Sequence, residues 1–148
     1  MNVAQLCSRN VVTVRKIDEV IVAARLMRER HVGFLVVTEP DFAGTIERPI
    51  GVLTDRDIVV KALAQGRDPA TTMCGELAQG TVRWTGADAS LDEALGMMRE
   101  HAVKRLIVMD DEKRLSGIIT EADVATHVPE GRTGELVGAI AAQPPQHF

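Results

Sequence analysis

Residues 51–58 read Gly-Val-Leu-Thr-Asp-Arg-Asp-Ile, and residues 117–124 read Gly-Ile-Ile-Thr-Glu-Ala-Asp-Val. Both segments place a glycine and apolar residues directly before Thr-x-x-Asp. This spacing is typical of a helix start, because the Thr and Asp side chains can accept hydrogen bonds from amides that have no helical partner. The preceding apolar residues suit a short buried strand. Each segment therefore predicts a strand that runs straight into a helix.

The similarity between the two halves extends upstream of these segments. Residues 26–37 read Leu-Met-Arg-Glu-Arg-His-Val-Gly-Phe-Leu-Val-Val, and residues 97–108 read Met-Met-Arg-Glu-His-Ala-Val-Lys-Arg-Leu-Ile-Val. Between the two blocks, the first copy has the longer connection, 38–49 against 109–115, which suits an insertion in a surface loop. The sequence is therefore an internal repeat and predicts two copies of one structural unit.

Each copy predicts the element order β-α-β-β-α. The first helix of each copy carries apolar residues at positions i, i+3, i+4 and i+7, from Val20 to Met27 and from Leu91 to Met98. Ser90 and Glu93 have the spacing of a capping box at the start of the second of these helices. The other expected strands and helices are 11–14, 34–37, 50–53 and 55–64 in the first copy, and 82–85, 106–109, 117–119 and 121–127 in the second.

The predicted fold class is α/β (α+β), with two β-α-β-β-α repeats packed into one unit. A repeat of about 55 residues cannot easily bury its sheet and helices alone, so the two should pack together. We expect domain 1 at 3–66, domain 2 at 67–128 with a short linker helix at 71–78, and a C-terminal extension at 129–148 that ends in a short helix followed by disorder. The segment 3–7 corresponds to the linker helix of the other copy.

Composition excludes several classes of protein. The formal net charge is -4, and aromatic residues make up 3% of the chain with no Tyr, so neither a basic surface nor stacking platforms favour nucleic-acid binding. Apolar runs are too short for a membrane span, and no signal peptide is visible, so we expect a cytoplasmic protein.

The sequence also lacks the common catalytic motifs. It contains no GxSxG, HExxH, P-loop or GxGxxG pattern, and we expect no catalytic residue and no enzymatic activity. The histidines show no metal-ligand spacing, so no metal site is expected. They are His31, His101, His127 and His147. Cys7 and Cys74 are interpreted as ordinary buried thiols, and a redox pair between them stays an open alternative.

With this element order and two Gly-apolar-x-Thr-x-x-Asp motifs, the sequence resembles the CBS-domain family over residues 3–128. It is similar in layout to small stand-alone bacterial members with Thr-Asp-Arg-Asp in the first repeat and Thr-Glu-Ala-Asp in the second, including hypoxia- and dormancy-response proteins. The resemblance implies a tandem pair (Bateman module) with pseudo-two-fold symmetry and two clefts between the sheets. It also implies frequent homodimerisation, and binding of AMP, ADP, ATP, S-adenosylmethionine or related adenosyl ligands. The helices that carry Val20, Met27, Leu91 and Met98 are expected to contribute to the dimer.

The Thr-x-x-Asp segments suit a ribose phosphate for chemical reasons of their own. Asp57 and Asp123 can each offer two acceptor oxygens to adjacent ribose hydroxyls, with Thr54 and Thr120 as hydroxyl partners. The amides of a helix start favour an anionic phosphate. The same spacing also serves as a helix cap that binds nothing, and both interpretations stay open.

Cationic and apolar candidates complete the predicted site. Arg56 can pair with a phosphate, and its counterpart in the second copy is Ala122, so the two sites differ in charge. Lys104 and Arg105 match positions that the resemblance assigns to phosphate contacts, where the first copy has Gly33 and Phe34. For the arginines and the lysine the alternative is a solvated surface position. An adenine slot is assigned to four apolar residues, which could equally be plain core. They are Val12, Val32, Ile50 and Val103.

Two functions follow as hypotheses. The first is a non-catalytic regulatory protein of signal transduction that senses an adenosyl ligand and acts on a separate, unknown protein partner. The second is a ligand-free homodimeric interaction scaffold. Neither requires a cofactor.

Overall fold

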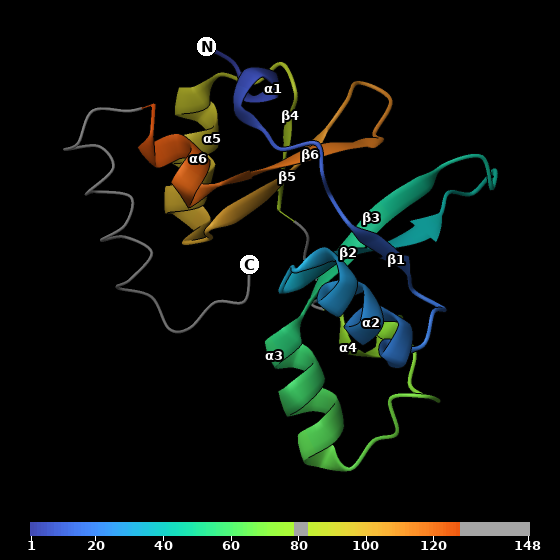
Figure 1. The fold of residues 1–148 in the computed structure, drawn as a ribbon. Coiled ribbons are helices and arrows are strands. Elements are labelled where there is room, and N and C mark those ends of the chain that lie inside the picture. The colour runs from blue at the N-terminus through green and yellow to red at the C-terminus, as the bar shows by residue number, and fades with distance from the viewer. Residues whose placement is uncertain (79–82, 128–148) are drawn as a thin grey trace. The chain divides into compact units, whose positions relative to one another are not determined.

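The computed structural model describes residues 1–78 and 83–127, which form two compact units (Figure 1). The first unit contains the described residues from Val11 to Ala78. The second contains Met1–Asn10 and the described residues from Arg83 to His127. Each unit is built around one three-stranded sheet. No helix in the described ranges combines the length and the apolar character needed to cross a bilayer.

The sheet of the first unit has the strand order β1-β2-β3. Its parallel pair, β1 and β2, is joined through helix α2, and β3 returns antiparallel to β2 as a hairpin. The register of the hairpin shifts between Val37 and Thr38. The bounds are β1 Thr13–Arg15, α2 Val20–Arg30, β2 Phe34–Pro40 and β3 Glu47–Thr54.

A helical segment follows β3 without a break, as the Thr-x-x-Asp pattern predicts. It consists of α3 (Asp55–Asp57), a π-helical stretch η1 (Ile58–Ala62) and a 3-10 turn η2 (Leu63–Gln65). The segment ends at Gly66, whose φ of 71° lies in the left-handed region that glycine adopts without strain. The predicted helix at 55–64 is confirmed.

The second unit repeats the same order with β4, α5, β5, β6 and α6. Helix α5 begins with the predicted capping box, in which the Glu93 amide donates to Ser90 Oγ (3.1 Å) and the Ser90 amide donates to Glu93 Oε2 (3.0 Å). The bounds are β4 Trp84–Gly86, α5 Leu91–His101, β5 Arg105–Met109, β6 Leu115–Thr120 and α6 Glu121–Ala125. The tail predicted at 129–148 lies outside the described residues.

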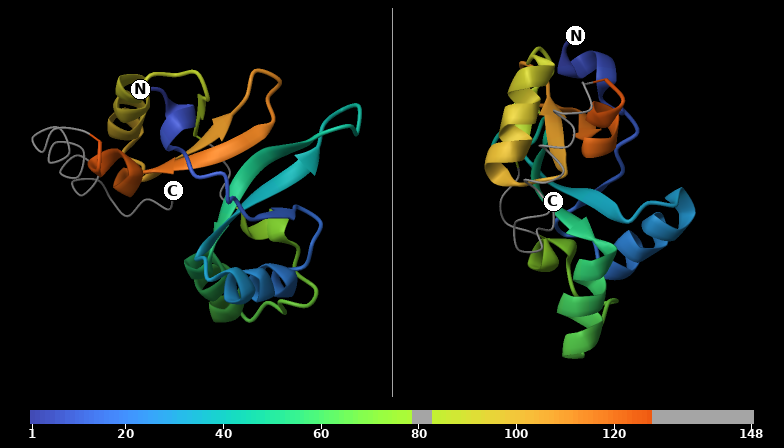
Figure 2. Two further views of the ribbon diagram at one scale, coloured as in Figure 1. Left: turned by 45° about the horizontal axis from the view of Figure 1, so that its top comes forward. Right: turned by 90° about the vertical axis from the view of Figure 1, so that its left-hand side faces the viewer.

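The short helices α1 (Val3–Leu6) and α4 (Cys74–Leu77) each join the sheet of the other copy (Figure 2). In the second unit, the Val3 amide donates to Ala89 O (2.9 Å). In the first unit, the Cys74 amide donates to Asp18 O (2.8 Å) and the Gly75 amide donates to the Lys16 carbonyl (2.9 Å). The compact units therefore do not coincide with the sequence repeats 3–66 and 67–128, because the repeats exchange their short helices.

The apolar stripes of α2 and α5 face the cores of their own units. Val20 and Met27 are buried with Leu35, Leu53 and other residues of the first unit. In the second unit, Met98 is buried and Leu91 packs against the core as a half-buried residue. These side chains thus stabilise the individual units and offer little surface to a second chain.

Candidate functional site

A pocket of about 330 Å³ lies in the second unit, where β5 begins and β6 passes into α6. It combines two cationic side chains with the threonine of the Thr-x-x-Asp motif. Its lining residues are Lys104, Arg105, Thr120, Glu121, Ala122 and Ala125. Three of the residues predicted for a ligand site, Lys104, Arg105 and Thr120, are therefore brought together at one opening.

Local hydrogen bonds hold this corner in shape. Thr120 Oγ1 accepts from the Asp123 amide (3.2 Å), and Asp123 Oδ2 accepts from the Thr120 amide (2.9 Å), which closes a capping box. The Glu121 amide donates to the Lys104 carbonyl (2.8 Å) and so fixes the start of β5 beside the start of α6. Asp123 is partly exposed on the same turn, although it is not among the residues that line the pocket.

The corresponding corner of the first unit has the same strand-to-helix turn but different side-chain contacts. Thr54 and Asp57 form the equivalent capping box, at 3.1 and 2.9 Å. Asp57 is only 2% exposed, and Lys61 Nζ lies 3.2 Å from its Oδ1. Lys61 Nζ also donates to the Leu77 carbonyl (3.2 Å), which belongs to α4.

Charge also differs between the two corners. In the first unit, Gly33 and Phe34 occupy the positions of Lys104 and Arg105. A β-carbon on Gly33 would lie 3.1 Å from Asp55 Oδ2, so a carboxylate occupies the space next to this position. Arg56 is exposed on the first turn that follows.

The four apolar candidates do not form one slot within a unit. Val12, Val32 and Ile50 are half-buried and pack against the core of the first unit. Val103 is 6% exposed and belongs to the core of the second unit. They contribute to packing, and the pocket lining includes none of them.

Three lining residues were not among the predicted site residues, namely Glu121, Ala122 and Ala125. A signal for them existed, because they follow Thr120 within the first turns of the helix that the motif starts. Two small alanine side chains there leave room that a larger residue would fill.

The cysteines and the potential metal ligands were also among the candidate functional residues. Cys74 is buried in the first unit, and this burial raises the pKa of its thiol to about 11, so the neutral form dominates at pH 7. Cys7 is half-buried in the second unit, and both cysteines are free. Within residues 1–78 and 83–127, no three His, Cys, Asp or Glu side chains gather closely enough to hold a metal ion.

Comparisons with known proteins agree on one family. The model of the CBS domain matches residues 3–63 and 76–130. Hypoxic response protein 1 of Mycobacterium tuberculosis is 42% identical over 137 residues, which cover 93% of this chain and 92% of that protein. A crystal structure of Hypoxic Response Protein I with two coordinated zinc ions has 40% identity and a TM-score of 0.72, and covers 87% of this chain and 100% of that one. The cytosolic domain of the Mg²⁺ channel MgtE in complex with ATP has 27% identity and a TM-score of 0.70, and covers 86% of this chain and 48% of that one.

Proposed function

Because the chain belongs to the CBS-domain family, we propose that it is a non-catalytic regulatory protein that senses an adenosyl ligand. The ligand class comprises AMP, ADP, ATP and S-adenosylmethionine. The ligand would bind at the Thr-x-x-Asp corner of a repeat. It would regulate a separate protein by binding more tightly to one conformation of this chain than to another.

The pocket beside Thr120 is the observation that carries this proposal. Its volume of about 330 Å³ falls at the lower end of the range for small-molecule sites, roughly 300–1,000 Å³. Lys104 and Arg105 at its wall favour a phosphorylated ligand, because ammonium and guanidinium groups form charge-assisted hydrogen bonds with phosphate oxygens. The MgtE relative that was solved with ATP supports an adenine nucleotide as the first ligand to test.

A thermal-shift panel tests the proposal on the full chain. At a ligand concentration near 100 times Kd, binding should add about 2.7 kcal/mol to the free energy of unfolding. This gain should raise Tm by roughly 5–10 °C for a chain of this length. Phosphorylated ligands should outcompete adenosine, and their affinity should fall with added salt. If AMP, ADP, ATP and S-adenosylmethionine at millimolar concentration all leave Tm unchanged, the proposal is wrong.

A ligand-free interaction scaffold is the second candidate, and the capping boxes favour it. In both units the Thr hydroxyl and one carboxylate oxygen already bond to backbone amides, so the motif has a structural use without a ligand. The same panel separates the two functions, because a scaffold would show no shift with any adenosyl compound.

We also propose that two copies of the chain associate. The helical segment after β3 exposes three apolar side chains close together in sequence, with Val59 54%, Val60 43% and Leu63 56% exposed. Exposed apolar side chains that cluster on one element favour an interface. This segment therefore replaces the stripes of α2 and α5 as the surface that we assign to the dimer.

A further inference from the structure

We infer that each chain binds one nucleotide, in the pocket beside Thr120, and that Lys61 closes the equivalent site of the first unit. The inference rests on the proposed function and specifies how many sites can work. The shared motif alone would make Asp57 and Asp123 equivalent. The inference depends on the different contacts that the two carboxylates make.

Asp57 has both carboxylate oxygens engaged within the first unit. Oδ2 accepts from the Thr54 amide at 2.9 Å, and Oδ1 lies 3.2 Å from Lys61 Nζ. At 2% exposure the carboxylate presents almost no surface to a ribose hydroxyl. A ligand would have to displace Lys61 from this buried carboxylate before it could use the group, and a buried carboxylate that loses its partner is costly.

Lys61 is itself held in place by a second element. Its Nζ donates to the Leu77 carbonyl at 3.2 Å, at the end of α4. Helix α4 is in turn bonded to the loop after β1 through the Cys74 and Gly75 amides. We call the contacts of Lys61 with Asp57 and Leu77 the Lys61 clasp. It connects the helix start to α4.

Asp123 has different surroundings in the second unit. The residue that corresponds to Lys61 is His127, which is exposed and whose Nδ1 lies 3.1 Å from the Asp123 carbonyl rather than from its carboxylate. Across the described parts of the chain, no ion pair involves the Asp123 carboxylate. Its Oδ2 serves the cap, and the partly exposed carboxylate keeps an acceptor for a ribose hydroxyl.

The charges around the two corners also favour ligand binding in the second unit. Lys104 is exposed and lines the pocket of the second unit. At the matching position Gly33 has no side chain, and the Asp55 carboxylate lies against that space. Glu121, the counterpart of Asp55, also lines the pocket, so each corner carries a carboxylate. The corners differ because Lys104 supplies a cation to attract a phosphate in the second unit, whereas Gly33 supplies none at the matching position of the first.

Isothermal titration of the full chain with ATP and with AMP tests the inference. The wild type should bind one nucleotide per chain. Asp123→Asn should weaken binding at least tenfold by removing the charged acceptor, whereas Asp57→Asn should leave Kd within about twofold. Two variants at exposed positions are less prone to folding defects. Lys104→Ala should weaken ATP binding about tenfold, and Arg56→Ala should leave ATP binding unchanged.

Thermal unfolding without ligand tests the Lys61 clasp independently of nucleotide binding. Asp57→Asn and Lys61→Met should each lower Tm, and the double variant should lower it by less than the sum, because both changes remove the same ion pair. Additive shifts would overturn the clasp. Two nucleotides per wild-type chain, or weakened binding in Asp57→Asn or Arg56→Ala, would overturn the single site while leaving the proposed function intact. No binding to the wild type would overturn both.

Discussion

Gly117 shows how a single residue permits a long-range contact. A β-carbon at this position would lie 2.6 Å from the Ser8 carbonyl oxygen and 2.9 Å from Cys7 Sγ. Next to it, Ser8 and Ile118 exchange backbone hydrogen bonds of 2.8 and 2.9 Å. The missing side chain therefore allows the N-terminal segment to lie directly against β6.

Gly117→Ala should destabilise the chain by about 1–3 kcal/mol, because the new methyl group would meet backbone that cannot move without breaking the Ser8–Ile118 pair. Gly96→Ala is the matched control. Gly96 lies inside α5, where a β-carbon would have no heavy atom within 4 Å, so alanine should stabilise by about 0.5–1 kcal/mol. Urea unfolding of both variants checks the prediction, and shifts of the same sign would contradict it.

The site residues show what the motif could and could not predict. Thr54 with Asp57 and Thr120 with Asp123 form the caps that their spacing predicts, because a cap depends only on neighbours along the chain. The Lys61–Leu77 contact could not be predicted, since it joins residues from different elements and depends on where α4 packs.

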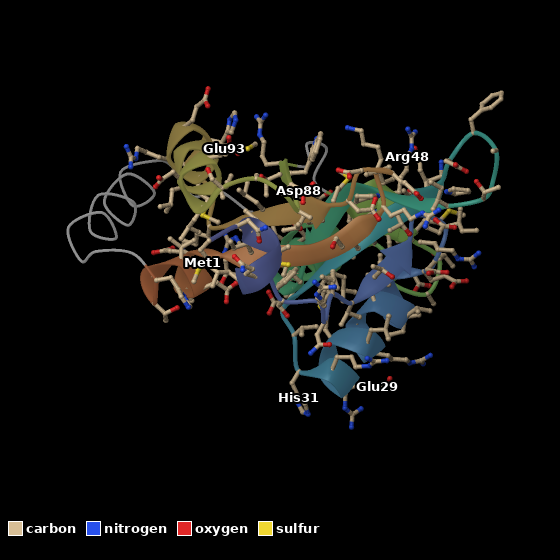
Figure 3. All side chains as sticks on the ribbon, turned by 90° about the horizontal axis from the view of Figure 1, so that it is seen from above. Met1, Glu29, His31, Arg48, Asp88 and Glu93 are labelled. Carbon is tan, nitrogen blue, oxygen red and sulfur yellow. The ribbon has the colours of Figure 1, made fainter. Side chains whose placement is uncertain are left out.

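At the scale of the element, the matching helices α2 and α5 begin differently but end in the same way. Helix α5 has the Ser90–Glu93 capping box, whereas Glu19 at the start of α2 makes no side-chain cap bond. Both helices end on a residue in the left-handed conformation, and His31 at the end of α2 extends into solvent (Figure 3). The start of α2 is thus the less well stabilised of the two.

Ser90→Ala should lower the free energy of unfolding by about 1 kcal/mol, because the Glu93 amide loses its acceptor. Glu19→Ser should raise it by up to about 1 kcal/mol, because a hydroxyl can then accept from an amide of the first turn of α2. Thermal and urea unfolding of the two variants measure these changes. A Glu19→Ser variant less stable than wild type would show that the side chain has another role.

The sequence predicted the positions of the helices and strands better than it predicted which of them pack together. The positions of α2, α5 and the two hairpins follow from periodicity, which is a local property of the chain. Strands β1 and β4 begin two residues later than expected, at Thr13 and Trp84, because the parallel pairing with β2 and β5 decides where each begins. The exchange of α1 and α4 between the repeats leaves no local signal, since either sheet offers similar apolar residues.

At the scale of the whole molecule, sedimentation should show a dimer. At tens of micromolar we expect a species of about twice the 16.1 kDa chain mass. Leu63→Glu should shift it towards the monomer by placing a charge on the exposed apolar segment after β3. Phe42→Glu is the control, since Phe42 is fully exposed on the loop between β2 and β3, away from that segment, and should leave the dimer intact. A wild-type monomer would refute the proposed association.

The exchange of short helices also bears on the order in which the chain can fold during synthesis. Everything that the first unit needs, from Val11 to Ala78, leaves the ribosome before the second sheet exists. Met1–Asn10 emerges before the first unit does, yet the strand that it pairs with ends at Thr120. Residues 1–10 can therefore reach their native partners only after β6 has been synthesised. A nascent chain halted after Ala78 would hold one folded unit, with residues 1–10 still unpaired.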